Sequence, residues 1–297
     1  MIETVFSFLD KNAIPYETDV PMSERTTFRL GGVAPLMVSP SSAAQMSSLI
    51  GFLQKQEIPY FVMGNGSNLI VSDEVPEIVF IRTLSMNGFY LDGTRLIADA
   101  GCRNSIIAVA AMNAGLTGLE FLHGIPGSVG GAIAMNAGAY DGVVSDVLQS
   151  VTYADEDGIL RTSSIKQEDF GYRKSPFSSP DRTVCSAVFQ LKAGDRRDIQ
   201  KTMNELIERR RSSQPLEYPS AGSIFKRPEG YYASKLIQDC GLKGLTVGGA
   251  QVSEKHAGFI INKGNATAED VLALIRQIQK NVEERYHVRL EPEVRVI

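Results

Sequence analysis

The chain has 297 residues, of which 43% are hydrophobic and 22% charged, and its formal net charge at pH 7 is −4. These values are typical of a soluble globular protein, and they exclude a disordered, collagen-like or coiled-coil chain. A protein that binds the phosphates of a polynucleotide is normally basic, so the acidic balance argues against a nucleic-acid partner. At roughly 150 residues per domain, the length predicts two or three folding units.

Cysteine and histidine usage bears on redox compartment and metal binding. The three cysteines, Cys102, Cys185 and Cys240, lie far apart and form no CxxC pair. The sequence therefore predicts neither a disulfide framework nor a structural zinc site, and it favours the reducing cytoplasm. The three histidines are too scattered for a metal site, so we expect no metal. We also expect no membrane association, because no apolar run approaches about 18 residues and no signal peptide is evident.

The first third of the chain is expected to form short strands separated by small turns. Its apolar runs predict strands at residues 58–63, 69–71, 77–81 and 95–98. A helix should follow over residues 105–114, where Ile106, Val109 and Ala110 repeat at helical spacing. Gly115 supplies its C-terminal stop.

The rest of the chain mixes strands and helices. We expect strands at residues 147–154, 184–191 and 288–297, and helices at 199–211 and 232–238, with a third helix that begins after Thr267. On the strand at 184–191, Cys185 should be buried on one face with Ala187 and Phe189. Thr267 and Asp270 have the spacing of a capping box. Because no βαβ rhythm is evident, we predict an α+β fold rather than a doubly wound parallel sheet.

Two glycine-rich segments are the first candidates for a ligand site. One is Gly64-Asn65-Gly66-Ser67-Asn68; the other covers residues 123–132 and continues through 136–139. Bare backbone of this kind lets a phosphate approach successive N–H groups. Neither segment is the GxGxxG or the P-loop motif, and tight turns would give the same pattern. Two such loops within about 80 residues nevertheless favour a phosphate-bearing cofactor.

Other polar segments have ordinary explanations when taken singly. Residues 170–177 place two cations in what would otherwise be a surface loop, and Arg209-Arg210-Arg211 suits the C-terminal end of a helix by its dipole alone. Ser223 follows a glycine but lacks the GxSxG context of a hydrolase nucleophile, so it is more plausible as a donor. Glu291 and Glu293 would share one face of a strand, where exposure is the default.

Six segments together resemble the UDP-N-acetylenolpyruvoylglucosamine reductase family, whose members are also called UDP-N-acetylmuramate dehydrogenases. They are residues 27–32 (TFRLGG), 64–69 (GNGSNL), 123–131 (HGIPGSVGG), 172–175 (YRKS), 220–226 (SAGSIFK) and 291–295 (EPEVR). Each segment alone is weak, but six in this order are specific, and the resemblance covers nearly the whole chain.

The resemblance implies a two-subdomain FAD-binding fold of the vanillyl-alcohol-oxidase (PCMH) type plus a C-terminal α+β substrate-binding domain. The corresponding ranges are 1–80 and 81–193 for the two FAD-binding subdomains and 194–297 for the substrate domain, with the final strand 291–297 returning to the first. It also implies non-covalent FAD, NADPH as co-substrate, and reduction of UDP-N-acetylglucosamine enolpyruvate to UDP-N-acetylmuramate for peptidoglycan synthesis. The sequence itself does not distinguish NADPH from NADH.

Three catalytic residues follow from the resemblance. Arg173 would stabilise the negative charge that develops on the substrate, and Ser223 would protonate the resulting enolate. Glu293 would assist at the same centre; it is preferred to Glu291 because the family's glutamate directly precedes the Val-Arg ending.

The resemblance also assigns binding residues. Cofactor binding falls on Gly64, Asn65, Gly66, Ser67, Asn68, Leu69, Gly127, Ser128, Gly130, Gly131, Ala132, Asn136, Gly138, Ala139 and Arg210. Substrate binding falls on Tyr172, Lys226, Tyr232, Lys235 and His256, although solvated surface is an alternative for each of them.

Two departures from the family pattern are visible. Only 50 positions separate Arg173 from Ser223, so this chain resembles the shorter form of the family, which lacks an inserted tyrosine loop. Ser213 stands where many members carry a lysine before Gln-Pro, so the phosphate contact that this lysine implies is not predicted for this chain.

Two other functions compete with the reductase. A sugar-lactone or alcohol oxidase would keep the flavin fold, and its relatives often tether the flavin covalently, for which His123 is the histidine in a glycine loop. A non-catalytic flavin-binding module would bind without turnover. We expect a cytoplasmic monomer acting on a small-molecule substrate.

Overall fold

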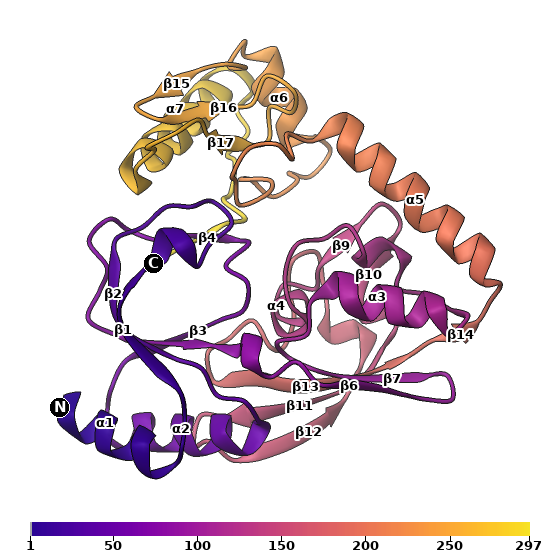
Figure 1. Cartoon of the computed structure of the whole chain (residues 1–297). Helices are drawn as coiled ribbons and strands as arrows, with labels where there is room; N and C mark the ends of the chain where they lie inside the picture. Colours follow the sequence, from indigo (N-terminus) through magenta and orange to yellow (C-terminus); the bar gives the residue numbers. More distant parts are fainter. Residues whose placement is uncertain (1) are drawn as a thin grey trace. The chain divides into compact units, whose positions relative to one another are not determined.

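The computed structural model describes residues 2–297, which divide into two compact units that are each discontinuous in sequence (Figure 1). The first unit contains residues up to 19, 35–65 and 77–208. The second contains residues 20–34, 66–76 and 209–297. The predicted range 1–80 is thus shared between the units, and the division at 80 and 193 stays a prediction.

The N-terminal region forms a four-stranded sheet with two helices. The elements are α1 (Ile2–Lys11), β1 (Tyr16–Pro21), β2 (Val33–Val38), α2 (Ala43–Lys55), β3 (Tyr60–Met63) and β5 (Val79–Arg82). Strand β5 pairs in parallel with both β2 and β3, in the sheet order β1-β2-β5-β3. Ser42 is the N-cap of helix α2, and its hydroxyl accepts a hydrogen bond from the backbone N–H of Gln45. The expectation of strands alone in this region was therefore wrong, and a local β-α-β pattern is present.

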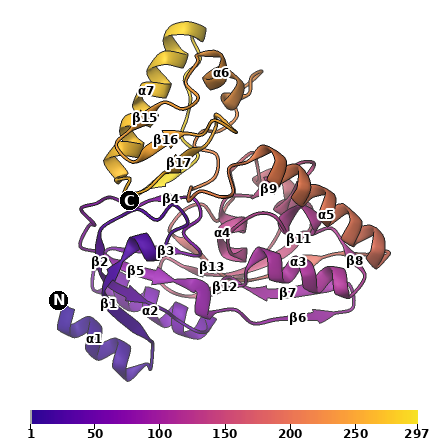
Figure 2. The same cartoon turned by 45° about the horizontal axis from the view of Figure 1, so that its top comes forward.

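The largest sheet of the first unit has five antiparallel strands (Figure 2). Its order is β12 (Leu160–Ser164), β11 (Leu148–Asp155), β13 (Arg182–Gln190), β7 (Arg95–Asp99) and β6 (Phe89–Asp92). Helices α3 (Asn104–Asn113) and α4 (Val129–Ala134) pack with this sheet around one hydrophobic core. Short pairs complete the unit: β8 (Leu116–Thr117) with β14 (Lys192–Ala193), and β9 (Gly138–Ala139) with β10 (Gly142–Val143).

Cys185 on β13 illustrates how a bulge changes a strand's side-chain pattern. The residue is 0% exposed, so the prediction that it is buried is confirmed. It packs with residues of α2, however, whereas Ala187 and Phe189 belong to the core that contains α3 and α4. The register of β13 against β11 shifts beside Cys185, because Thr152 pairs with Ser186 and Tyr153 with Val184. The prediction of a shared face was wrong because this irregularity interrupts the alternation.

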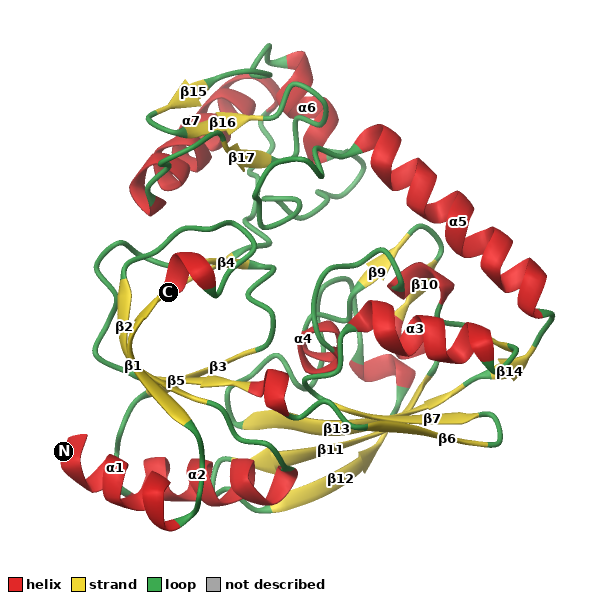
Figure 3. Cartoon of the chain, in the orientation of Figure 1, coloured by secondary structure: helices red, strands yellow, loops and turns green. Residues whose placement is uncertain are grey.

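The second unit combines helices with very short strands (Figure 3). Its elements are α6 (Ala233–Asp239), β15 (Thr246–Val247), β16 (Ala250–Val252), β17 (Ile260–Asn262) and α7 (Ala268–Tyr286). Strands β15, β16 and β17 form an antiparallel sheet, and β18 (Arg295–Val296) pairs in parallel with β4 (Leu69–Ile70). Helix α5 (Arg196–Ser213) begins in the first unit and ends in the second.

Helix α7 confirms the predicted capping box. The hydroxyl of Thr267 accepts a hydrogen bond from the N–H of Asp270 at 3.1 Å, and the Asp270 carboxylate accepts one from the N–H of Thr267 at 3.0 Å. The stripe that includes Val271 and Ile278 is fully buried. Two backbone N–H groups at the helix start are thus satisfied, which fixes where α7 begins.

The predicted final strand at 288–297 was mostly wrong. Only Arg295 and Val296 pair as a strand, and Pro292 makes an isolated bridge with Phe225. Proline has no N–H to give to a ladder, so continuous pairing is interrupted there. Among the helices of residues 2–297, none combines the length and apolar character that crossing a membrane requires.

Candidate cofactor and substrate site

The first glycine-rich loop follows β3. A Cβ atom placed on Gly64 would lie 2.1 Å from the Oγ of Ser128, so a side chain at this position would displace that hydroxyl. Gly66 has a φ of +64°, and a Cβ atom there would lie 2.6 Å from the carbonyl oxygen of Arg25. The backbone itself requires glycine at Gly66, whereas at Gly64 the Ser128 side chain limits the space. The units divide between Asn65 and Gly66.

Ser128, in the second loop, carries an unusual hydroxyl. The residue is 1% exposed, and no described residue gives its Oγ a hydrogen-bond partner. It is the N-cap of α4, yet the hydroxyl makes no capping bond within the described chain. The Oγ lies beside two glycines: a Cβ atom placed on Gly131 would be 3.7 Å from it, and one placed on Gly64 would be closer still. Neither glycine has a side chain that covers the hydroxyl. A buried hydroxyl without a partner is costly, so this group fits a ligand oxygen or N–H.

A cavity of about 310 Å³ in the first unit lies next to these loops. It is lined by Asn65, Arg103, Ser105, His123, Gly124, Ile125, Pro126 and Gly127. Arg103 and Ser105 come from the start of α3, where the side chain of Arg103 makes no capping bond within the described chain. The Nδ1 atom of His123 is buried without a partner among the described residues. A helix N-terminus, a guanidinium and an imidazole, with no lining carboxylate, suit an anion such as a phosphate.

The residue types present therefore fit the phosphate-bearing part of FAD. Asn65, Gly127 and Ser128 were predicted from the resemblance, whereas Arg103 and Ser105 were missed. The predicted helix at 105–114 could have identified them, because the first N–H groups of a helix have no partner within the helix and are available to a ligand. His123 had been considered only for the competing oxidase.

Arg173 lies at the tip of a tight turn in the first unit. Gly171 and Lys174 exchange two backbone hydrogen bonds, at 3.0 and 3.1 Å. The φ of Arg173 is +55°, in the left-handed region that non-glycine residues seldom occupy. Its guanidinium donates to the carbonyl of Gly138 at 3.3 Å and lies 5.1 Å from the centre of the Tyr172 ring. The turn and its arginine are therefore attached to the second glycine-rich loop.

Ser223 and Glu293 come together in the second unit. The backbone N–H of Glu293 donates to the carbonyl of Ile224, the residue after Ser223, at 2.7 Å. The side chain of Asn68 donates to the carbonyl of Glu293 at 3.0 Å. The hydroxyl of Ser223 donates to the carbonyl of Phe225 at 3.2 Å. Segments far apart in sequence (66–69, 220–226 and 291–295) are thus joined by backbone contacts.

The two C-terminal glutamates differ in their surroundings. The carboxylate of Glu291 forms an ion pair with the ammonium group of Lys226 at 3.1 Å, with both side chains exposed. Glu293 is held by its backbone on both sides. Lys226, expected to bind substrate, therefore already has a surface partner in this structure.

The remaining substrate candidates also have partners. Tyr232 is exposed, and the guanidinium of Arg227 lies 4.0 Å from the centre of the Tyr232 ring. The ammonium group of Lys235 forms an ion pair with the carboxylate of Asp239 at 2.6 Å. His256 packs edge-on against Phe259, and its Nδ1 accepts a hydrogen bond from the N–H of Gly258 at 3.2 Å. Burial lowers the pKa of His256, so the imidazole stays neutral near pH 7. Arg210 lies in the last turn of α5.

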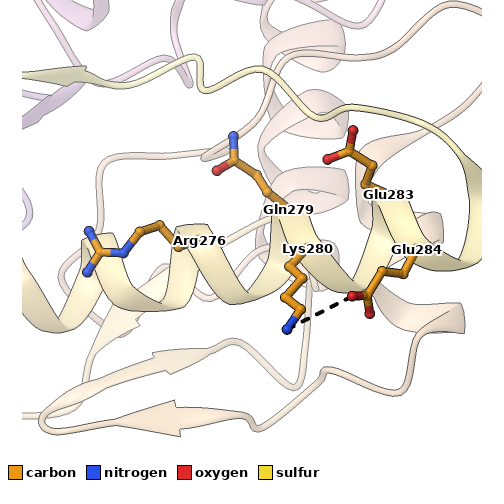
Figure 4. A pocket seen from close by; sticks show the side chains of 5 residues that line it. All are labelled: Arg276, Gln279, Lys280, Glu283 and Glu284. Carbon is orange, nitrogen blue, oxygen red and sulfur yellow. Dashed lines mark ion pairs between the residues drawn. The ribbon is translucent and has the colours of Figure 1, made fainter.

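A further hollow of about 400 Å³ runs along α7 (Figure 4). All five lining side chains come from that one helix, and Lys280 and Glu284 are 3.9 Å apart as an ion pair. Opposite charges at i and i+4 are ordinary for an exposed helix face, so this hollow has no feature of a site. Within residues 2–297, no group of three or more His, Cys, Asp or Glu side chains could hold a metal ion.

Comparison with known proteins gives consistent results. A family model described as "UDP-N-acetylenolpyruvoylglucosamine reductase, C-terminal domain" matches residues 214–297, and one described as "FAD binding domain" matches residues 34–164. The chain is 46% identical over 291 residues to a UDP-N-acetylenolpyruvoylglucosamine reductase of Clostridium novyi, which covers 98% of this chain and 94% of the relative. It is 47% identical over 277 residues to the protein of that name in Caldanaerobacter subterraneus, with 93% and 92% covered.

Solved structures are similar as well. The crystal structure of UDP-N-acetylenolpyruvylglucosamine reductase from Thermus caldophilus matches with a TM-score of 0.81 and 36% identity, over 95% of this chain and 98% of that one. Phl p 4.0202, a glucose dehydrogenase, matches with a TM-score of 0.50 and 14% identity over 64% of this chain and 44% of its own. The second likeness shows the fold alone.

Proposed function

The chain belongs to the UDP-N-acetylenolpyruvoylglucosamine reductase family, and from this premise we propose how its residues divide the reaction. The protein reduces UDP-N-acetylglucosamine enolpyruvate to UDP-N-acetylmuramate for peptidoglycan synthesis, with NADPH as the electron donor and FAD as the cofactor. When bound, FAD carries hydride from NADPH to the enolpyruvyl double bond. The observation that carries the cofactor part is the buried hydroxyl of Ser128, left without a partner among the described residues beside Gly64.

The cofactor is held through its phosphates by the two glycine-rich loops. Asn65, Ser128 and the N-terminus of α3 supply hydrogen-bond donors, and Arg103 supplies a positive charge. The other predicted cofactor residues, including Gly130, Ala132 and Arg210, belong to the same proposal. The binding is non-covalent: His123 lines the cavity at the phosphate-binding loops, where it serves as a donor.

Arg173 stabilises the negative charge that develops on the substrate carboxylate once its double bond is reduced. A guanidinium suits this role because it stays charged and donates in a planar fork that matches a carboxylate. Its position at the tip of a turn tied to Gly138 supports the proposal, since a preorganised cation costs little reorganisation during the reaction.

Ser223 donates the proton that completes the reduction. A hydroxyl is a weak acid in water, but an enolate is basic enough to take its proton when the two are aligned. Among the described residues, the hydroxyl bonds only to a carbonyl two residues away, a contact that rotation of the side chain can exchange for substrate. Glu293 assists Ser223, and the backbone contacts that hold it next to Ile224 support this pairing. Tyr172, Lys226, Tyr232, Lys235 and His256 are proposed to bind the substrate.

Domain roles, location and assembly complete the proposal. The ranges 1–80 and 81–193 bind FAD and 194–297 binds substrate, which the family matches at 34–164 and 214–297 support. We place the protein in the cytoplasm as a monomer. Three cysteines without a disulfide among the described residues suit a reducing compartment.

Steady-state turnover tests the function against its runner-up. The reductase oxidises NADPH only when the enolpyruvyl sugar nucleotide is added, and it yields the lactyl ether as product. An enzyme that instead consumes oxygen with an alcohol or a sugar lactone, and whose yellow colour precipitates with the denatured protein, would be the oxidase. Binding of FAD with neither turnover would leave only a flavin-binding module.

A further inference from the structure

Asn136 occupies a junction of three segments in the first unit. It is 5% exposed, and its φ is +41°, in the left-handed region. Its Oδ1 accepts a hydrogen bond from the N–H of Ser145 at 3.1 Å, and its Nδ2 donates to the carbonyl of Gly171 at 3.0 Å. The two partners fix which way the amide points, because an N–H needs an acceptor and a carbonyl needs a donor. Both ends of this side chain are therefore engaged with protein.

The bond to Gly171 reaches the base of the turn that carries Arg173. Gly171 and Lys174 close this turn with two backbone hydrogen bonds, so the turn can move as one piece. Farther along, the hydroxyl of Ser178 donates to the carbonyl of Ala134 at 2.5 Å. The guanidinium of Arg173 itself reaches the carbonyl of Gly138. These three hydrogen bonds attach the loop to residues 134–138, and the bond from the Asn136 amide is the one of the three nearest the base of the turn.

The receiving segment is itself restrained. Gly138 pairs with Val143 in the β9–β10 hairpin, and a Cβ atom on Gly138 would lie 2.5 Å from the Cγ1 of Val143. Asn136 also holds the N–H of Ser145, which follows this hairpin. The amide consequently ties the Arg173 turn to the segments on both sides of this hairpin.

We infer that Asn136 is a positioning residue for Arg173, in addition to lying in a loop assigned to the cofactor. This inference rests on the proposed role of Arg173. Arginine carries its charge at the end of a long side chain, so a small pivot at Gly171 displaces the guanidinium much farther. A displacement of about 1 Å at a reacting group can reduce the rate about 100-fold.

The test separates the two half-reactions and the binding of FAD. Asn136→Asp keeps the acceptor for Ser145 and tolerates the left-handed backbone, but it replaces the donor to Gly171 with an oxygen. In stopped flow, we expect about 10- to 100-fold slower reoxidation of the reduced enzyme by the enolpyruvyl substrate. Reduction by NADPH and the Kd for FAD should change by less than about threefold, since neither uses Arg173. The Asn136 side chain is occupied by Ser145 and Gly171, so its contact with the cofactor would be made by the backbone, which the substitution keeps. Asn281→Asp controls for the amide-to-carboxylate change itself at an exposed position, because its amide also donates to a backbone carbonyl, that of Gln277 on α7.

The double variant with Arg173→Ala supplies the readout that a general structural defect would not move. If Asn136 acts through Arg173, adding Asn136→Asp to Arg173→Ala causes no further slowing. Additive slowing, equal slowing of both half-reactions, or a weaker FAD complex would overturn the inference. Asn136→Gly, which removes the side chain but accepts positive φ, repeats the test if the aspartate variant folds poorly. Wild-type enzyme that the substrate fails to reoxidise would instead contradict the proposed function.

Discussion

Replacing Ser128 with alanine should have opposite effects on the protein without FAD and on its complex with FAD. The hydroxyl is 1% exposed and makes no hydrogen bond with any described residue. An unsatisfied buried hydroxyl costs about 1–3 kcal/mol, so its removal should stabilise the apoprotein by about 1 kcal/mol. Because the hydroxyl makes no capping bond to α4, alanine loses nothing there.

In the complex, the same hydroxyl is expected to bond with FAD, and its removal should cost about 1 kcal/mol. The two effects add in the binding equilibrium to about 2 kcal/mol, which weakens FAD binding roughly 30-fold. The unfolding temperature of the apoprotein should rise by about 2–4 °C. A titration that follows the quenching of flavin fluorescence gives the Kd for FAD.

Ser253 provides the matched control. It is also 1% exposed, but its hydroxyl accepts hydrogen bonds from the N–H groups of Lys255 and His256, both at 3.2 Å. Ser253→Ala should therefore lower the unfolding temperature of the apoprotein and leave FAD affinity unchanged. If Ser128→Ala destabilises the apoprotein in the same way, or binds FAD as tightly as the wild type, the reasoning about the orphaned hydroxyl is wrong.

Three other predictions concern single residues. Ser223→Ala should leave reduction by NADPH nearly intact while reoxidation by substrate slows by several orders of magnitude; equal slowing in stopped flow would rule out the proton-donor role. Arg103→Ala should weaken FAD binding about 10-fold at low salt, with a smaller loss at high salt, and a salt-independent effect in a fluorescence titration would exclude a phosphate contact. Burial lowers the pKa of His256 in the folded protein, so the unfolded chain takes up a proton first as pH falls below about 6.5. Stability should then decline with falling pH, and urea unfolding at pH 7.5 and 5.5 should show a smaller decline in His256→Gln.

Local features of the sequence predicted the parts of the fold that depend on neighbouring residues. The capping box at Thr267 and Asp270 and the buried stripe of α7 were readable because both follow helical spacing. The same signal was present for α2, where Ser42 and Gln45 form a cap before Met46, Leu49 and Ile50. The prediction assigned no element to residues 43–55, although the helical spacing was present there.

Contacts between distant segments could not be predicted in this way. Strand β4 at Leu69 pairs with β18 at Arg295, and periodicity within either segment contains no information about that partner. The division of the chain into two discontinuous units has the same cause. Glycine density did locate both loops, because the positive φ at Gly66 requires that residue type and the Ser128 side chain leaves little space at Gly64. Arg103 was missed because a single cation before a helix has no distinctive pattern.

Electron transfer from NADPH through FAD to an enolpyruvyl sugar nucleotide is the activity on which the proposed residue roles depend. An anaerobic visible spectrum of the purified holoprotein tests it most directly, recorded alone, after NADPH, and after UDP-N-acetylglucosamine enolpyruvate. We expect the flavin bands to bleach with NADPH and to return with that substrate. Bands that bleach but do not return would contradict the substrate, and a colourless protein that takes up no added FAD would contradict the cofactor as well.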